Sequence, residues 1–142
     1  MNFSINKELL QNLLLEHQKV VPIRSTLPIL SCAYLRIEKQ TLHITTTDLE
    51  QTIVSSVPII NEKEGSACVP MARFCEIVTA LQNEEIKINT NEDQLIEINS
   101  NQGTYKITGR DPKEYPETTE TGKKERFKIV GIKEPPDYER RT

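Results

Sequence analysis

The chain of 142 residues contains no tryptophan, five glycines and three cysteines, and each shortage excludes a class of protein. Without tryptophan, and with a hydrophobic fraction of 36%, the core is predicted to be small and aliphatic. The glycines are not clustered, so the sequence lacks a glycine-rich loop of the kind that binds phosphate groups. Cys32, Cys68 and Cys75 form no close pair and leave one cysteine over. This pattern favours reduced, mostly buried thiols over a disulfide framework.

Long apolar runs are absent as well. No stretch of the sequence approaches the length of a membrane span, and residues 1–5 lack the basic and apolar regions of a signal peptide. We therefore expect a cytoplasmic protein without a membrane partner. The net charge of −3 at pH 7 is not typical of a protein that binds nucleic acid. It does not exclude one, because the electric field at a surface depends on where the charges lie.

Side chains that carry catalytic or metal chemistry are few and poorly spaced. His17 is predicted near a helix end and His43 within a strand, and neither lies at metal-binding spacing from a cysteine. Asp48 and Glu50 form a carboxylate pair that a small acid–base enzyme would need. An alternative fits better, because Asp48 follows three threonines at a strand end and can accept hydrogen bonds within its own turn. The sequence thus predicts no catalytic residue, no metal ion and no cofactor.

The spacing of apolar residues predicts an α+β domain over residues 1–120. Two helices, each apolar on one side only, are expected after Asn6, a good N-cap, and after Pro70. About eight strands are expected, at residues 1–5, 27–37, 42–45, 51–59, 66–69, 86–89, 95–98 and 105–107. Residues 61–65 are polar and are interpreted as a loop. We expect both helices to lie side by side on one face of antiparallel sheet.

A segment with a proline near each end, residues 22–30, joins the first helix to the next strand and presents Arg24. Pro22 and Pro28 fix φ at their positions, so the segment is stiff and Arg24 is held on it. Arg73 lies near a helix N-terminus, an end that prefers anions. An external anion would account for either arginine, and so would an ordinary surface position.

The last predicted strand of the domain and the tail leave two further questions open. Tyr105 and Ile107 fit either a core or an edge strand that pairs with another chain. In the tail, Phe127-Lys128-Ile129 followed by Lys133-Glu134 repeats the opening pattern Phe3-Ser4-Ile5 followed by Lys7-Glu8. This repeat predicts the start of a second copy of the domain. The prolines beyond it cannot continue a helix, so we expect about the last 20 residues to be extended or poorly ordered.

Together these motifs resemble the N-terminal domain of the bacterial DNA polymerase III β subunit, the sliding clamp. The match follows the family's order and spacing over residues 1–120. The matching segments are Phe3-x-Ile5, Arg24-x-Thr26-Leu27-Pro28-Ile29-Leu30, Thr45-x-Thr47-Asp48-Leu49-Glu50, Val69-Pro70-x-x-Arg73-Phe74 and the final strand with Tyr115-Pro116.

The resemblance implies a DNA-clamp domain. Family members carry three such domains, and two chains close into a ring that encircles duplex DNA and tethers the polymerase without catalysis. The implied partners are double-stranded DNA without sequence preference, other clamp protomers and, for the full-length protein, polymerase and clamp loader. The implied DNA-binding residues are Arg24, Arg73 and Lys19, and the implied dimer interface is Tyr105, Ile107, Ile77 and Leu81.

The family's second domain would begin where this chain ends. Residues 1–120 are therefore expected to be the first clamp domain of a fragment. Residues 121–142 are expected to be a linker plus a truncated or divergent start of the second clamp domain, poorly ordered. The alternative is a stand-alone interaction module that pairs with a clamp through its last strand.

Overall fold

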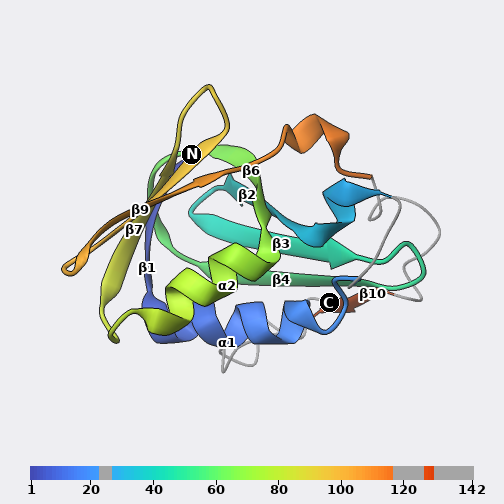
Figure 1. The fold of residues 1–142 in the computed structure, drawn as a ribbon, viewed down its shortest axis with the longest axis horizontal. Coiled ribbons are helices and arrows are strands. Elements are labelled where there is room, and N and C mark those ends of the chain that lie inside the picture. Colours follow the sequence, from blue (N-terminus) through green and yellow to red (C-terminus); the bar gives the residue numbers. More distant parts are fainter. Residues whose placement is uncertain (23–26, 117–126, 130–142) are drawn as a thin grey trace.

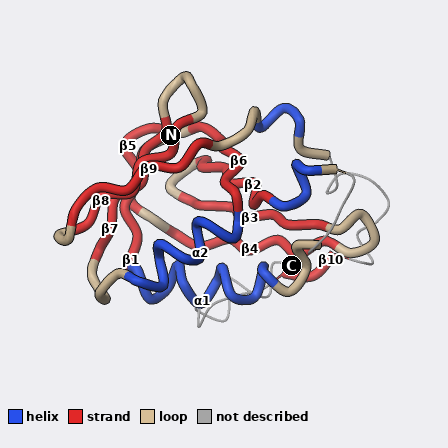
Figure 2. The backbone as a smooth tube through the Cα atoms, viewed as in Figure 1, coloured by secondary structure: helices blue, strands red, loops and turns tan. Residues whose placement is uncertain are grey.

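The strands are divided between two five-stranded sheets, and two helices lie against each other across them (Figure 1, Figure 2). The structure, a computed structural model, describes residues 1–22, 27–116 and 127–129. Its elements are β1 (Asn2–Asn6), α1 (Lys7–Gln18), η1 (Pro28–Ser31), β2 (Cys32–Glu38), β3 (Thr41–Thr47), β4 (Thr52–Pro58), β5 (Ile60–Lys63), β6 (Gly65–Pro70), α2 (Met71–Ala80), β7 (Glu85–Thr90), β8 (Leu95–Ser100), β9 (Gly103–Thr108), η2 (Pro112–Glu114) and β10 (Phe127–Ile129).

The first sheet has the order β5-β1-β7-β8-β9 and the second sheet the order β10-β4-β3-β2-β6. All pairings are antiparallel except that of β10, which lies parallel to β4. The helix α1 lies near β1 and β3, and α2 lies near β2, β6 and β9. Each helix therefore covers strands of both sheets, and a single apolar layer serves the whole domain.

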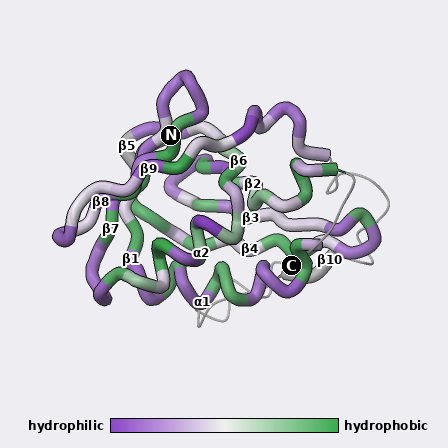
Figure 3. The backbone as a smooth tube through the Cα atoms, in the orientation of Figure 1, coloured by the Kyte–Doolittle hydropathy of each residue, from purple (hydrophilic) through white to green (hydrophobic). Residues whose placement is uncertain are grey.

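The two helices are apolar on one side, as predicted, and Figure 3 shows green and purple stretches alternating along both. From α1, Leu10 and Leu13 are buried, and from α2, Phe74 and Val78. They meet inward-facing strand residues of both sheets in one cluster. Full burial of side chains of this size is the main stabilising term of the domain.

The start of α1 is fixed by Asn6, as predicted. Its side chain Oδ1 accepts a hydrogen bond of 3.1 Å from the Leu9 amide, which would otherwise be one of the unpaired donors of the first turn. We expect Asn6→Ala to lower the free energy of unfolding by about 1 kcal/mol. Urea denaturation measures this change. Asn12→Ala, at an exposed position of the same helix, is the control, and an equal loss there would contradict the capping role.

The sequence prediction is confirmed in its α+β class and in all eight strands, with differences in detail. The strand expected at residues 27–37 begins at Cys32, because Pro28–Ser31 forms a 3₁₀ turn. There the Ser31 hydroxyl donates to the Pro28 carbonyl at 2.7 Å. The loop interpretation of residues 61–65 is wrong, because Ile60–Lys63 pairs with β1 at the edge of the first sheet. The strands also form two sheets where the sequence pattern suggested one.

A small second cluster lies beside the main core. Ile29 and Leu30 of η1 pack there with Cys32, Cys68 and Tyr115. The ring of Tyr115 stacks on that of Tyr34, with centroids 5.5 Å apart and planes 15° from parallel. Burial raises the pKa of Cys68 to about 12, and it also raises the pKa values of Cys32 and Cys75. All three cysteines are buried, as the sequence predicts.

The last turn of α1 buries a histidine among hydroxyl groups. His17 is 0% exposed; its Nδ1 lies 2.7 Å from Thr46 Oγ1 on β3, and its Nε2 lies 2.7 Å from Ser55 Oγ on β4. Burial lowers the pKa of His17 from 6.5 to about 4. The ring is therefore neutral at physiological pH and links the end of α1 to two strands of the second sheet.

Candidate functional site

A groove of about 560 Å³ separates α2 from β9. β9 ends the first sheet and pairs with β8 alone among the described strands. The outer flank of α2 faces this edge because Phe74 and Val78 point into the core. The groove is lined by Arg73, Glu76, Ile77 and Ala80 from α2 and by Tyr105, Lys106, Ile107 and Thr108 from β9.

Three of the four predicted interface residues line this groove. Ile77 and Tyr105 are half-buried and lie on its two sides. Ile107 lines it too, although its side chain is 5% exposed and belongs to the core. Leu81 does not line the groove and is a core residue, 4% exposed. The sequence left open whether Tyr105 and Ile107 belong to the core or to an exposed edge strand. Tyr105 is half-buried at the groove, whereas Ile107 belongs to the core.

Arg73 stands at the rim of the groove, in the first turn of α2, and is exposed. Its Nε lies 3.8 Å from Oε1 of Glu76. The positive end of the helix dipole disfavours the Arg73 cation, and the Glu76 carboxylate, three residues later, offsets this. The i, i+3 spacing of Arg73 and Glu76 is visible in the sequence and could have predicted this pair. Because both side chains are exposed, the pair is weak and the guanidinium can reach another anion.

Lys19 follows the last turn of α1, where a cation suits the helix polarity. Its Nζ lies 3.4 Å from Oε2 of Glu16, and both side chains are exposed to solvent. Arg24, which the sequence predicts as a DNA-binding residue, lies outside the described residues. Its neighbours Pro22 and Leu27 are described, and Leu27 is exposed.

The helices run antiparallel, which brings two of the predicted DNA contacts to one end of the helix pair. The start of α1 is tied to the segment after α2, since the Lys7 amide donates to the Glu84 carbonyl at 2.8 Å. Asn83 Nδ2 also donates to Glu8 Oε1 at 3.4 Å. The last turn of α1, which Lys19 follows, and the first turn of α2, which contains Arg73, are therefore both at the other end of the antiparallel pair (Figure 1).

The carboxylate pair considered for catalysis has another use. Oδ1 of Asp48 accepts hydrogen bonds from the amides of Glu50 and Gln51 at 2.9 and 2.8 Å. The hydroxyl of Thr47 accepts a further one from the Leu49 amide at 3.0 Å. These bonds hold the turn between β3 and β4, as the alternative interpretation predicts. Asp48 is thus a structural residue of the turn.

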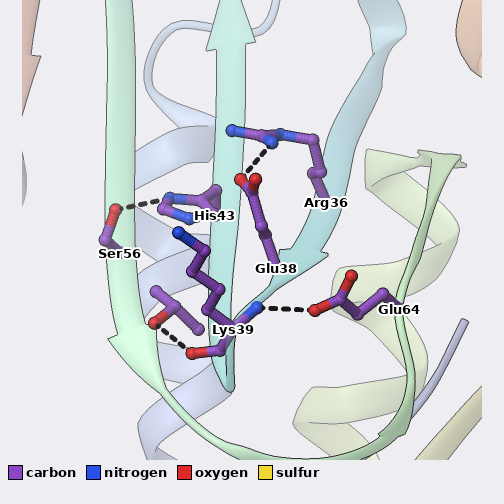
Figure 4. A network of polar contacts seen from close by, with 7 residues as sticks. Arg36, Glu38, Lys39, His43, Ser56 and Glu64 are labelled. Atoms are coloured by element: carbon purple, nitrogen blue, oxygen red, sulfur yellow. Dashed lines mark hydrogen bonds and ion pairs between the residues drawn. The ribbon is translucent and has the colours of Figure 1, made fainter.

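Figure 4 shows a second polar group, on the strands β2, β3 and β4. Arg36 is paired with Glu38, and the Lys39 amide donates to Glu64 at 2.8 Å. His43 lies across from Ser56, with its Nδ1 2.8 Å from the hydroxyl oxygen. Burial and the nearby Arg36 cation lower the pKa of His43. The side chains of the labelled residues other than Lys39 are thus engaged in contacts within the sheet or with an adjoining turn, which is the pattern of a structural surface network.

Within the described residues there is no group of three or more His, Cys, Asp and Glu side chains that could bind a metal ion. In the described ranges, no helix has both the length and the apolar character that crossing a bilayer requires.

Comparisons of sequence and of structure with known proteins both match this chain to the same family. The model of the family described as "DNA polymerase III beta subunit, N-terminal domain" matches residues 1–119. A beta sliding clamp of Staphylococcus epidermidis is 30% identical over 124 residues, which cover 82% of this chain and 33% of that protein. One of Staphylococcus aureus is 29% identical over the same length.

Solved structures agree in fold. A DNA polymerase III subunit beta from Pseudomonas aeruginosa superposes with a TM-score of 0.79 and 28% identity, over 85% of this chain and 33% of that one. A Helicobacter pylori beta clamp, solved bound to a DNA ligase peptide, has a TM-score of 0.80. It is 24% identical and covers 86% of this chain and 34% of its own, a likeness of fold alone.

Proposed function

Because the chain belongs to the DNA polymerase III beta subunit family and matches its N-terminal domain, we propose that it works as the first domain of a sliding clamp. In this proposal the domain is a non-catalytic part of a ring around duplex DNA, with polymerase and clamp loader as partners of the complete protein. The chain spans about a third of the length of the curated relatives that it matches. Relatives that are clamps favour this role over a separate interaction module.

The single observation that carries the proposal is the grouping of cations at one end of the antiparallel helix pair. Lys19 and Arg73 lie there, each exposed and each held only by a weak ion pair. Arg24 follows α1 by a few residues in the sequence. We infer that these three side chains contact phosphate oxygens. Contacts of that kind carry no sequence information, so a ring that uses them can slide.

The subunit contact is assigned to the groove between α2 and β9. An edge strand offers unpaired backbone groups, and the apolar sides of Ile77 and Tyr105 flank it. Ile107 belongs to the core and lines the same groove with its buried side chain. The ring then holds DNA by enclosing it, which reconciles a net charge of −3 with work on nucleic acid.

Titration of a short duplex with this chain at low salt, followed by fluorescence anisotropy, tests the phosphate contacts. We expect weak binding whose salt dependence decreases by about 0.9 in slope for each of Lys19→Glu and Arg73→Glu. Lys113→Glu, which removes an exposed cation from η2, is the matched control and should leave the slope unchanged.

Two results would contradict the proposal. Equal losses in the control and in the test variants would mean that the binding depends only on total charge. Nanomolar affinity for linear duplex at physiological salt would mean that the domain holds DNA by contact instead of by enclosure, since non-specific binding by a few phosphate contacts is about micromolar or weaker.

A further inference from the structure

Two of the cations assigned to phosphate contacts each have a carboxylate three residues away in the sequence. The Nζ atom of Lys19 lies 3.4 Å from Oε2 of Glu16, and the Nε atom of Arg73 lies 3.8 Å from Oε1 of Glu76. Each of the four side chains is at least 45% exposed. An approaching phosphate group would therefore meet a carboxylate beside each of these two cations.

The charges of the helices cancel at this end of the antiparallel pair. In the last turn of α1 and the residue after it, the charged side chains are Glu16 and Lys19, because the buried His17 is neutral at physiological pH. In α2 they are Arg73 and Glu76. Two cations and two anions sum to zero over these described segments. A surface that only attracted phosphates would carry an excess of cations here.

Helix stability does not account for the two carboxylates. Glu16 stands in the last turn of α1, where the helix dipole favours cations. Glu76 offsets a dipole penalty of Arg73 that an uncharged residue at position 73 would not have. Because both pairs are exposed, each contributes little to the stability of its helix. The effect of the carboxylates is therefore on the two cations themselves.

We propose that Glu16 and Glu76 restrain the DNA contacts of this domain by competing with phosphate oxygens for Lys19 and Arg73. This inference rests on the proposed function and deepens it, because it assigns two acidic side chains a part in sliding. When a phosphate approaches, each cation has to leave its carboxylate, and the carboxylate repels the phosphate. Each contact is consequently weak and reversible, which suits a ring that moves along the duplex while it encloses it.

Titration of a short labelled duplex with the full chain carrying Glu16→Gln or Glu76→Gln, followed by fluorescence anisotropy, is the first test. We expect each substitution to raise the association constant about threefold at about 0.01 M salt. This is the factor expected in water when one charge about 6 Å from a phosphate is removed. The gain should shrink at about 0.1 M salt, because the Debye length falls from about 30 Å to about 10 Å.

The matched control is Glu38→Gln. Glu38 pairs with Arg36 on β2, and both side chains are exposed on the face of the second sheet opposite to the core. The control changes the net charge by the same amount and also breaks an exposed ion pair, so its gain in affinity should be far smaller. An equal gain in the control would overturn the proposal, because the affinity would then follow net charge alone.

A double-mutant cycle tests whether Glu76 acts through its partner. Glu76→Gln should raise the association constant less in an Arg73→Gln background than in the unmodified chain. Equal gains in the two backgrounds would overturn the competition between carboxylate and phosphate, since no arginine is then left to compete for.

The variants Lys19→Glu and Arg73→Glu distinguish a failure of this inference from a failure of the proposed function. If they weaken binding while Glu16→Gln and Glu76→Gln bring no gain, the restraint is wrong and the phosphate contacts stand. If Lys19→Glu and Arg73→Glu leave binding unchanged, the phosphate contacts are wrong, and the restraint is overturned with them.

Discussion

Lowering the pH from 7 to 4 is expected to remove about 3 kcal/mol from the free energy of unfolding through His17 alone. Burial lowers the pKa of this side chain from 6.5 to about 4. Between those two pH values the unfolded chain binds a proton that the folded domain does not. The contribution of His17 to the free energy of unfolding is therefore fully present above pH 6.5, decreases as the pH falls and is mostly lost near pH 4.

Urea denaturation at a series of pH values measures this dependence. His17→Gln removes the titrating group, so its stability should vary much less between pH 6.5 and 4, although it starts lower because one of the hydroxyls of Thr46 and Ser55 loses its partner. For comparison, His43→Gln removes the half-buried histidine of β3, whose pKa is also lowered, and it should reduce the pH dependence less than His17→Gln does. If His17→Gln keeps the full pH dependence of the unmodified chain, another group is responsible.

Tyr105→Glu is expected to weaken association with an intact clamp, such as that of Staphylococcus epidermidis, by at least about thirtyfold. The half-buried ring lines the groove beside Ile77, and aromatic side chains in such positions carry much of the energy of an interface. A carboxylate there would lose its hydration on binding, which costs free energy. Tyr105 is a better choice than Ile107, because Ile107→Asp would also place a charge in the core.

Analytical ultracentrifugation of the mixture measures this effect. The control is Ile60→Glu, which changes an exposed apolar residue on β5, at the opposite edge of the same sheet. The control should associate as the unmodified chain does. If the unmodified chain forms no complex at any concentration, or if both variants lose it equally, the groove is not the subunit contact.

The regular elements could be predicted because their apolar spacing is local. The leucines of α1 and the i, i+3, i+4 pattern from Phe74 in α2 identify one-sided helices without further information. Two of the differences from the prediction depend instead on contacts that are distant in the sequence. Ile60–Lys63 is polar yet forms a strand, because its backbone groups pair with β1, which lies far away in the sequence. Pro28–Ser31 does not continue the alternation of buried and exposed residues of β2, because it forms a 3₁₀ turn that places Ile29 and Leu30 in the second cluster.

The candidate site was only partly predictable, for the same reason. The residues Tyr105 and Ile107 are close together in one strand, but the groove that both of them line depends also on α2, more than twenty residues earlier in the chain. His17 continues the apolar side of α1, four residues after Leu13, but its partners could not be predicted because Thr46 and Ser55 follow it by 29 and 38 residues. Residue types indicated the chemistry, while sheet order and helix direction decided which side chains meet.

The stacked tyrosines have a mechanical consequence. Tyr115 lies near the end of the described range 27–116, and it packs with Ile29 and Leu30, which follow Arg24 by only a few residues in the sequence. Tension applied to the chain beyond Pro116 is therefore transmitted to η1 through a handful of side chains. Because Tyr34 and Cys68 are strand residues, the same force acts on η1 and on the second sheet together.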